Sequence, residues 1–281
     1  MPAYQLLGGR TRDKARVYYH VRGDTKEKLI QGVRDARSQG FTAVGHLTPF
    51  LDDSRKVPFL KTHVDMMKDA IRTVAAYREA DGDEVDLCIE IHRRLSPAEA
   101  IALARGIEEY HPFFYEDPIM ADNFDAMELV ANHIAIPIAT GERFHSIHEF
   151  AMLLKRGAVQ YVRPDVCMAG GLSHGKKIAA VAEAHYVTIA PHNPLGLIST
   201  AAGVHHAASI NNFTILEWHG DHKKKKSEFV NESWVPVDGY FELPTNPGIG
   251  MTLNHDAIAA NPPGHWDRGF ATYSDGTPGF L

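Results

Sequence analysis

The sequence contains little cysteine and no long hydrophobic run, and each absence excludes a class of protein. Its 281 residues include two cysteines, Cys88 and Cys167, too few for the disulfide framework of a small secreted domain. Both lie in apolar segments, so we expect both thiols to be buried. No stretch reaches the length of a membrane span, and the N-terminal residues lack the apolar core of a signal peptide. These absences predict a cytoplasmic protein with no membrane partner.

Several cofactor motifs are missing as well. No G-x-G-x-x-G follows the first predicted strand, no complete G-x-x-x-x-G-K-[ST] loop occurs, and the zinc motif H-E-x-x-H is absent. The net charge of −6 argues against a nucleic-acid partner. With 44% hydrophobic and 23% charged residues, the composition is that of a globular domain and not of a disordered chain.

What the sequence does contain is a repeated alternation of short apolar runs and amphipathic segments. Such alternation predicts a parallel sheet, and eight repeats favour an α/β fold closed into a (β/α)7β TIM-like barrel over a doubly wound open sheet. Ser96 followed by Pro97 is a typical helix start, and Gly157 a typical helix stop. The predicted strands are 16–21, 42–47, 85–92, 113–116, 137–142, 161–163, 187–190 and 213–218; the other predicted helices are 25–38, 64–79, 124–133, 147–156, 173–185 and 198–209.

The alternation weakens after the eighth predicted strand. From there the chain is rich in Gly, Pro, Asn and aromatic residues without a clear period. We therefore predict a barrel over residues 1–220 and a C-terminal extension over residues 221–281 that packs on it.

Three glutamates close three of the predicted strands. Glu90, Glu116 and Glu142 are each 26 residues from the next, so one repeating strand–helix unit would bring them to the same end of the barrel. Three converging carboxylates repel one another in a low-dielectric site unless a cation holds them. Hard oxygen ligands favour Mg²⁺ or Mn²⁺. The spacing therefore predicts a divalent metal site.

The same register continues beyond the glutamates. Asp165, His192 and Glu217 close the sixth, seventh and eighth predicted strands. A packed barrel needs none of these groups for stability, and burying any of them without compensation costs several kcal/mol. His92 follows Glu90 by two residues, so a continuous strand would point both side chains to the same face. The pattern indicates an active site at the carboxyl ends of the strands.

Taken together, these segments resemble the enolase superfamily in its mandelate-racemase-like branch, and most closely the acid-sugar dehydratases related to galactonate dehydratase. The matching segments are 90–93, 115–118, 139–143, 163–171 and 191–196.

The resemblance implies a role for each residue in the register. The three glutamates would bind Mg²⁺, with Mn²⁺ possible as a substitute. His192 would be the general base, and Asp165 would orient it. His92 would protonate the leaving hydroxyl, and Glu217 would hydrogen-bond the substrate carboxylate as it becomes an enediolate. The implied reaction is the Mg²⁺-dependent dehydration of an aldonate such as galactonate, gluconate or xylonate to its 2-keto-3-deoxy acid.

Three departures from the family pattern keep alternatives open. Relatives usually carry aspartate where this chain has Glu90. Glutamate is also a carboxylate, so this change preserves the metal-binding chemistry. They often carry two lysines on strand two, where this chain has only His46 as a candidate base, and this favours dehydration over racemisation. Their N-terminal α+β capping domain has no counterpart in this sequence. A non-catalytic metal-binding barrel, an epimerase or a cycloisomerase therefore remain alternatives, and uncovered apolar surface leads us to expect a homo-oligomer.

Overall fold

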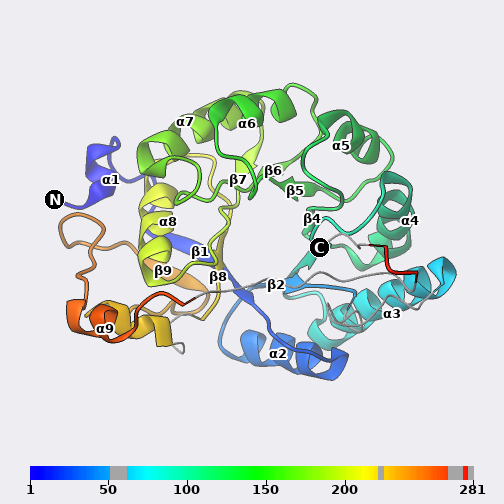
Figure 1. Ribbon diagram of the computed structural model, residues 1–281, viewed down its shortest axis with the longest axis horizontal. Helices are drawn as coiled ribbons and strands as arrows, with labels where there is room; N and C mark the ends of the chain where they lie inside the picture. The colour runs from blue at the N-terminus through cyan, green and yellow to red at the C-terminus, as the bar shows by residue number, and fades with distance from the viewer. Residues whose placement is uncertain (51–61, 221–224, 265–274, 278–281) are drawn as a thin grey trace.

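The computed structural model describes residues 1–50, 62–220, 225–264 and 275–277. Strands β1 to β8 alternate with helices α2 to α8, and the helices form an outer ring around the strands (Figure 1). The strands are β1 (Lys14–His20), β2 (Ala43–Leu47), β3 (Asp86–Glu90), β4 (Phe114–Glu116), β5 (Ile138–Thr140), β6 (Tyr161–Val162), β7 (Thr188–Ile189) and β8 (Leu216–Trp218). The helices are α2 (Lys26–Ser38), α3 (His63–Asp81), α4 (Pro97–Ile107), α5 (Phe124–Ala131), α6 (Ile147–Leu154), α7 (Gly171–Ala184) and α8 (Leu197–Ser209).

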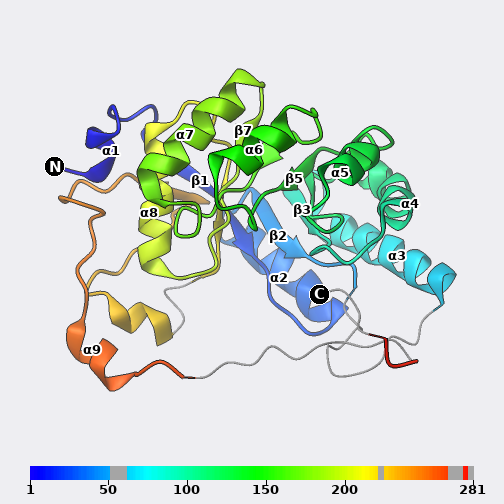
Figure 2. The same cartoon turned by 45° about the horizontal axis from the view of Figure 1, so that its top comes forward.

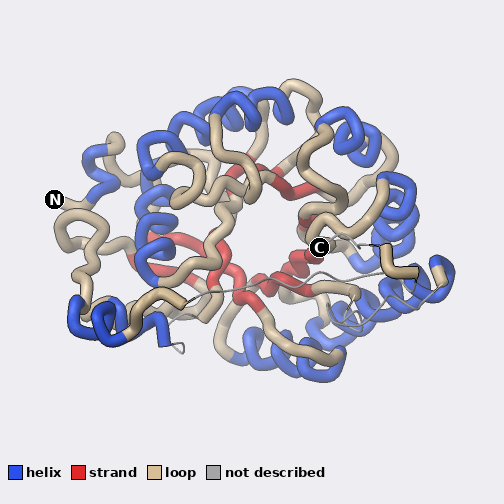
Figure 3. Tube along the Cα trace, viewed as in Figure 1, coloured by secondary structure: helices blue, strands red, loops and turns tan. Residues whose placement is uncertain are grey.

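The sheet closes on itself. Its strands follow the order β7-β6-β5-β4-β3-β2-β1-β8, and all these neighbours are parallel. The two ends meet because Ile189 N donates to Asn212 O at 2.8 Å and Thr214 N donates to Ile189 O at 2.9 Å. Figure 3 shows the strands as a ring, and Figure 2 shows the helices outside it. The prediction of a (β/α)7β barrel is confirmed, and the open doubly wound sheet is wrong.

Local signals in the sequence set the helix starts. Thr25 precedes α2 and accepts a hydrogen bond from Lys28 N at 3.3 Å, which satisfies one of the unpaired amides of the first turn. Ser96 precedes α4 and forms a capping box with Glu99, with Pro97 at the first helical position. The predicted helix starts lie within two residues of the observed ones, whereas several observed strands are shorter than predicted.

The barrel interior is a small apolar layer with one buried cation. The guanidinium of Arg163 lies 5.8 Å from the ring centroid of Tyr18 and 5.7 Å from that of Phe114. Cys88 is buried here as predicted, but Cys167 is exposed, so that prediction is wrong. Cys167 lies in the turn after β6, where its amide donates to Asp165 Oδ1. The layer consists of Tyr18, Ala43, Cys88, Phe114, Ala139, Ala190 and Ile215.

The ends of the chain add elements to the outside of the barrel. Strand β9 (Tyr240–Glu242) pairs antiparallel with the first residues of β1, and helix α9 (His255–Ala260) lies on the same side of the molecule (Figure 1). Helix α1 (Ala3–Leu6) contacts α8, where Tyr4 stacks on His205 at 5.3 Å between ring centroids. Among the described residues, no helix has both the length and the apolar character needed to cross a bilayer.

Asp81, at the end of α3, provides a stability prediction. It is completely buried, and neither carboxylate oxygen has a hydrogen-bond partner among the described residues. Burial raises the pKa of Asp81 to about 6, so the folded chain holds this proton to higher pH than the unfolded chain does. Ionisation therefore destabilises the fold as pH rises from about 4 to about 6.

Asp81→Asn is expected to raise the free energy of unfolding at pH 7.5 by about 1–2 kcal/mol and to change it little at pH 4. Urea denaturation at both pH values measures the difference. Asp83→Asn, at an exposed position in the next turn, is the matched control. An equal effect of Asp81→Asn at both pH values would contradict this account.

Candidate active site

The three predicted metal ligands lie at the carboxyl ends of adjacent strands. Glu90 and Glu116 end β3 and β4 and are register partners. Glu142 follows β5 after Gly141, whose φ of 129° belongs to a backbone region that other residues rarely adopt. A Cβ atom at Gly141 would also lie 2.7 Å from the ring of Phe150. The glycine turn thus brings Glu142 toward the other two glutamates.

The chemistry of this trio fits a divalent cation. All three glutamates are buried, and Glu90 Oε1 and Glu116 Oε2 have no hydrogen-bond partner among the described residues. Burial, then the charges of Glu116 and Glu142, raise the pKa of Glu90 far above its ordinary value. Burial also raises the pKa of Glu116 to about 8. Unpaired, mutually repelling carboxylate oxygens are the donor set that Mg²⁺ or Mn²⁺ binds.

Two buried arginines hold the carboxylates in place. Arg93 Nη1 donates to Glu142 Oε1 at 2.6 Å and also to Asp117. Arg163 Nε lies 2.6 Å from Glu116 Oε1, and its Nη2 donates to Glu217 Oε2 at 2.9 Å. Arg163 thus pairs with a carboxylate from β4 and one from β8. These contacts fix the carboxylate side chains before any ligand binds.

The backbone after β3 and β4 is strained. His92, Arg93 and Asp117 have φ values of 56°, 67° and 42°, in the left-handed region that costs about 1–3 kcal/mol per residue. The buried ion pair of Arg93 with Asp117 compensates for this strain. The prediction that His92 points to the same face as Glu90 assumed that the strand continues to His92. Because β3 ends at Glu90, that alternation does not apply to His92. His92 reaches the site instead through the turn, where Arg93 Nη2 donates to His92 Nε2 at 2.7 Å.

His192 and Asp165 form the predicted pair. His192 Nδ1 donates to Asp165 Oδ2 at 3.0 Å, and His192 Nε2 lies 3.3 Å from Glu142 Oε2. Burial lowers the pKa of His192, but the Asp165 hydrogen bond and the charges of Glu217 and Glu142 outweigh it and raise that pKa to about 9. Asp165 therefore fixes the tautomer in which Nε2 faces the glutamates.

Glu217 closes the ring of ionisable groups from the side of β8. Its Oε2 accepts from Arg163 and, at 3.1 Å, from Asn193 N. Its Oε1 accepts from His219 Nε2 at 2.6 Å. Burial raises the pKa of Glu217, but these hydrogen bonds and charges outweigh it and hold that pKa well below the ordinary value. Glu217 is thus an ionised hydrogen-bond acceptor with donors on both of its oxygens.

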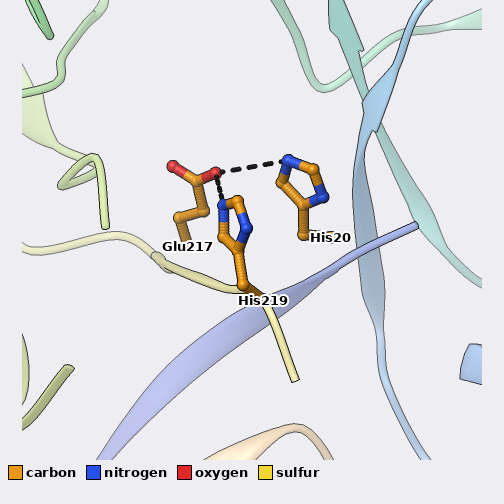
Figure 4. A group of neighbouring side chains, drawn as sticks. All are labelled: His20, Glu217 and His219. Carbon is orange, nitrogen blue, oxygen red and sulfur yellow. Dashed lines mark hydrogen bonds and ion pairs between the residues drawn. The ribbon is translucent and has the colours of Figure 1, made fainter. Parts of the chain in front are cut away.

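Among the described residues, the tightest group of candidate metal ligands is not the glutamate trio. His20, Glu217 and His219 present ligand atoms that all lie within 4.8 Å of one another (Figure 4). Neither His20 nor His219 is among the site residues predicted from the sequence. Both could have been predicted from their positions at strand ends. His20 ends β1 and His219 directly follows β8, in the same strand-end register as the residues of β3 to β8.

Comparison with known proteins gives the family. The model for the enolase C-terminal domain-like family matches residues 31–257. The D-galactonate dehydratase of Cronobacter sakazakii is 33% identical over 98% of this chain and 73% of that protein. The chain belongs to the enolase superfamily, in its mandelate-racemase-like branch.

Solved structures of the superfamily share the fold closely. An enolase from Agrobacterium radiobacter, described as a candidate galactarate dehydratase with bound Na and L-malate, matches with a TM-score of 0.90 and 30% identity over 100% of this chain and 74% of that one. A candidate mandelate racemase/muconate lactonizing enzyme from Labrenzia alexandrii matches with a TM-score of 0.88 and 30% identity over 97% of this chain and 71% of that one. Superfamily membership makes a divalent metal the expected ligand of this barrel.

Proposed function

We propose that this chain is a magnesium-dependent dehydratase that converts an aldonate, such as galactonate, gluconate or xylonate, to its 2-keto-3-deoxy acid. The observation that carries the proposal is the paired His192 and Asp165 beside three buried glutamates, of which Glu90 and Glu116 each present an oxygen with no hydrogen-bond partner among the described residues. The similarity to a D-galactonate dehydratase supports the reaction class.

Each chemical step has a candidate group. His192 takes the C2 proton of the sugar acid on Nε2 while Asp165 holds Nδ1–H. The leaving 3-hydroxyl receives a proton from His92. Because arginine can only donate, the contact from Arg93 makes His92 Nε2 an acceptor and leaves the transferable proton on Nδ1. The carbon chain loses H and OH, which together make one molecule of water.

The metal ligands would be Glu90, Glu116 and Glu142. A divalent cation held there would supply positive charge to stabilise the substrate carboxylate, and would reduce the negative field that raises the pKa of His192. Glu217, held by Arg163, would face the substrate carboxylate and would have to take up a proton to donate a hydrogen bond to it, because an ionised carboxylate only accepts. The buried arginine fixes that geometry in advance.

A product assay tests the function. The purified chain with MgCl₂ is expected to release a 2-keto-3-deoxy acid from at least one of galactonate, gluconate and xylonate, measured as the semicarbazone. Excess EDTA should abolish the signal, and MgCl₂ added after the chelator should restore it. Failure on all three acids would contradict the proposal. Magnesium binding by calorimetry without product would favour the non-catalytic barrel instead.

A further inference from the structure

A cluster of three histidines lies beside the proposed active site, at the ends of β1, β2 and β8. The ring of His20 stacks on that of His46 at 4.0 Å and on that of His219 at 3.7 Å between centroids. Figure 4 shows His20 and His219 converging on Glu217. His219 donates to Glu217 Oε1, and His20 Nε2 lies 3.7 Å from the same oxygen. None of the steps above uses these histidines.

A cavity adjoins the cluster on the side of β2. It has a volume of about 200 Å³, and its lining includes His20, Arg22, His46 and Thr48. This is roughly the volume of six or seven water molecules, enough for a short polar segment of two or three carbons. Glu217 separates this cavity from the glutamate trio, because one of its oxygens faces Arg163 and the other faces His219 and His20.

One nitrogen of the cluster is buried without a partner. His20 is 5% exposed, and its Nδ1 has no hydrogen-bond partner among the described residues. An unpaired buried polar atom is costly, so a ligand group that reaches it gains affinity. The cavity beside His20 is the space from which such a group could approach.

The charge state of the cluster favours hydroxyl groups as ligands. Burial, followed by the neighbouring histidines, lowers the pKa of His20 far below its ordinary value, and burial lowers that of His46 to about 4. Both rings are therefore neutral at pH 7, and each offers one donor and one acceptor. A hydroxyl also donates and accepts, whereas a second carboxylate would require donors alone.

The geometry of His219 argues against a metal at this cluster. Arg22 Nη2 lies 2.5 Å from His219 Nδ1, and arginine can only donate. The proton of His219 therefore sits on Nε2, which donates it to Glu217 Oε1 at 2.6 Å. A metal would need the lone pair of that nitrogen. The close approach of these three side chains is explained by hydrogen bonding.

We propose that His20 and His46 form a subsite for the terminal hydroxyl groups of the sugar acid, the end of the chain farthest from its carboxylate. The inference rests on the proposed function, because that function places the substrate carboxylate between the glutamate trio and Glu217. The cavity lined by the two histidines adjoins Glu217, because His20 lines it and His20 Nε2 lies 3.7 Å from Glu217 Oε1. The subsite would select long polyol monocarboxylates over short acids and over dicarboxylates.

Binding measurements with ligands of two lengths test the subsite. In the presence of MgCl₂, calorimetry is expected to show that D-gluconate binds at least about tenfold more tightly than D-glycerate, which has no distal hydroxyls. His46→Asn removes the ring while keeping a residue that tolerates the left-handed φ of 56°. His20→Phe keeps the stacked ring and removes both nitrogens. Each variant should weaken D-gluconate binding about 5- to 30-fold and leave D-glycerate binding within about twofold.

The controls separate this inference from the proposed function. His185→Asn, at an exposed position where α7 ends, should change neither affinity. The subsite would be overturned if the variants lose equal affinity for both ligands or lose affinity for neither. It would also be overturned if the unaltered chain does not bind D-gluconate. Tighter binding of galactarate than of D-gluconate would also overturn it, in favour of a carboxylate pocket. If the affinities change as expected but no acid is dehydrated, the proposed function fails and the subsite stands.

Discussion

Replacing His192 with asparagine is expected to lower kcat for acid-sugar dehydration by about 10²–10⁴-fold, the usual contribution of a general base. The reason is geometric, because His192 Nε2 faces the glutamate trio while Nδ1 is held by Asp165 at 3.0 Å. Asparagine preserves a polar contact to Asp165 but cannot accept the proton. Steady-state kinetics of keto-acid release, at saturating Mg²⁺, provides the measurement.

Asp165→Asn refines the same test. Since the hydrogen bond that His192 donates to Asp165 raises the pKa of His192, its loss should move the acidic limb of the rate profile to lower pH, because a base works only when it is deprotonated. His185→Asn is the matched control, since its side chain is exposed where α7 ends. A turnover number that survives His192→Asn would remove His192 from the mechanism.

Glu116→Gln carries the second large expected effect. Glu116 is almost completely buried, and its Oε2 has no hydrogen-bond partner among the described residues. Replacing one charged ligand by an amide should weaken Mg²⁺ binding by about 100-fold or more, since even outer contacts of metal sites contribute 10- to 100-fold. At limiting Mg²⁺, the rate of dehydration should fall in proportion to the fraction of the chain that has bound the metal.

Thermal unfolding reports the metal independently of activity. A cation that binds only the folded chain raises its stability by mass action, so millimolar MgCl₂ should raise the Tm of the unaltered chain. Glu116→Gln should lose most of that rise, whereas Glu183→Gln, at an exposed position on α7, should keep it. The metal assignment is wrong if Glu116→Gln responds to MgCl₂ as the unaltered chain does.

Much of the barrel was predictable because its signals are local. Helix caps such as Thr25 and Ser96 and the repeated strand–helix alternation need no knowledge of distant contacts. The spacing of Glu90 and Glu116 also follows from the repeat, and the structure places them as register partners. The strand-end residues are therefore predictable from the sequence alone.

The remaining features depend on tertiary contacts that a single segment does not encode. The orientation of His92 could not be obtained from strand alternation, because β3 stops at Glu90 and the chain turns through left-handed conformations held by Arg93 and Asp117. The exposure of Cys167 depends on the turn after β6. Likewise, the arginines that neutralise the carboxylates come from the separate segments that follow β3 and β6.

The histidine cluster was missed for a different reason. The predicted register began at the third strand and so left out His20 at the end of β1, whereas His46 in β2 was predicted only as a candidate base. The rule itself was sufficient to locate both residues. What it could not supply was the stacking of His20 on His46 and His219, which requires the closed barrel to bring β1, β2 and β8 together.

Proton nuclear magnetic resonance in D₂O distinguishes dehydration of the sugar acid from simple exchange of its C2 proton. Galactonate, gluconate and xylonate are each incubated with the chain and MgCl₂, and the C2 and C3 signals are followed. The account predicts loss of the C2 proton and release of a 2-keto-3-deoxy acid carrying solvent deuterium at C3, and neither change with His192→Asn or with EDTA. Deuterium at C2 without loss of water, or three unchanged spectra, would contradict it.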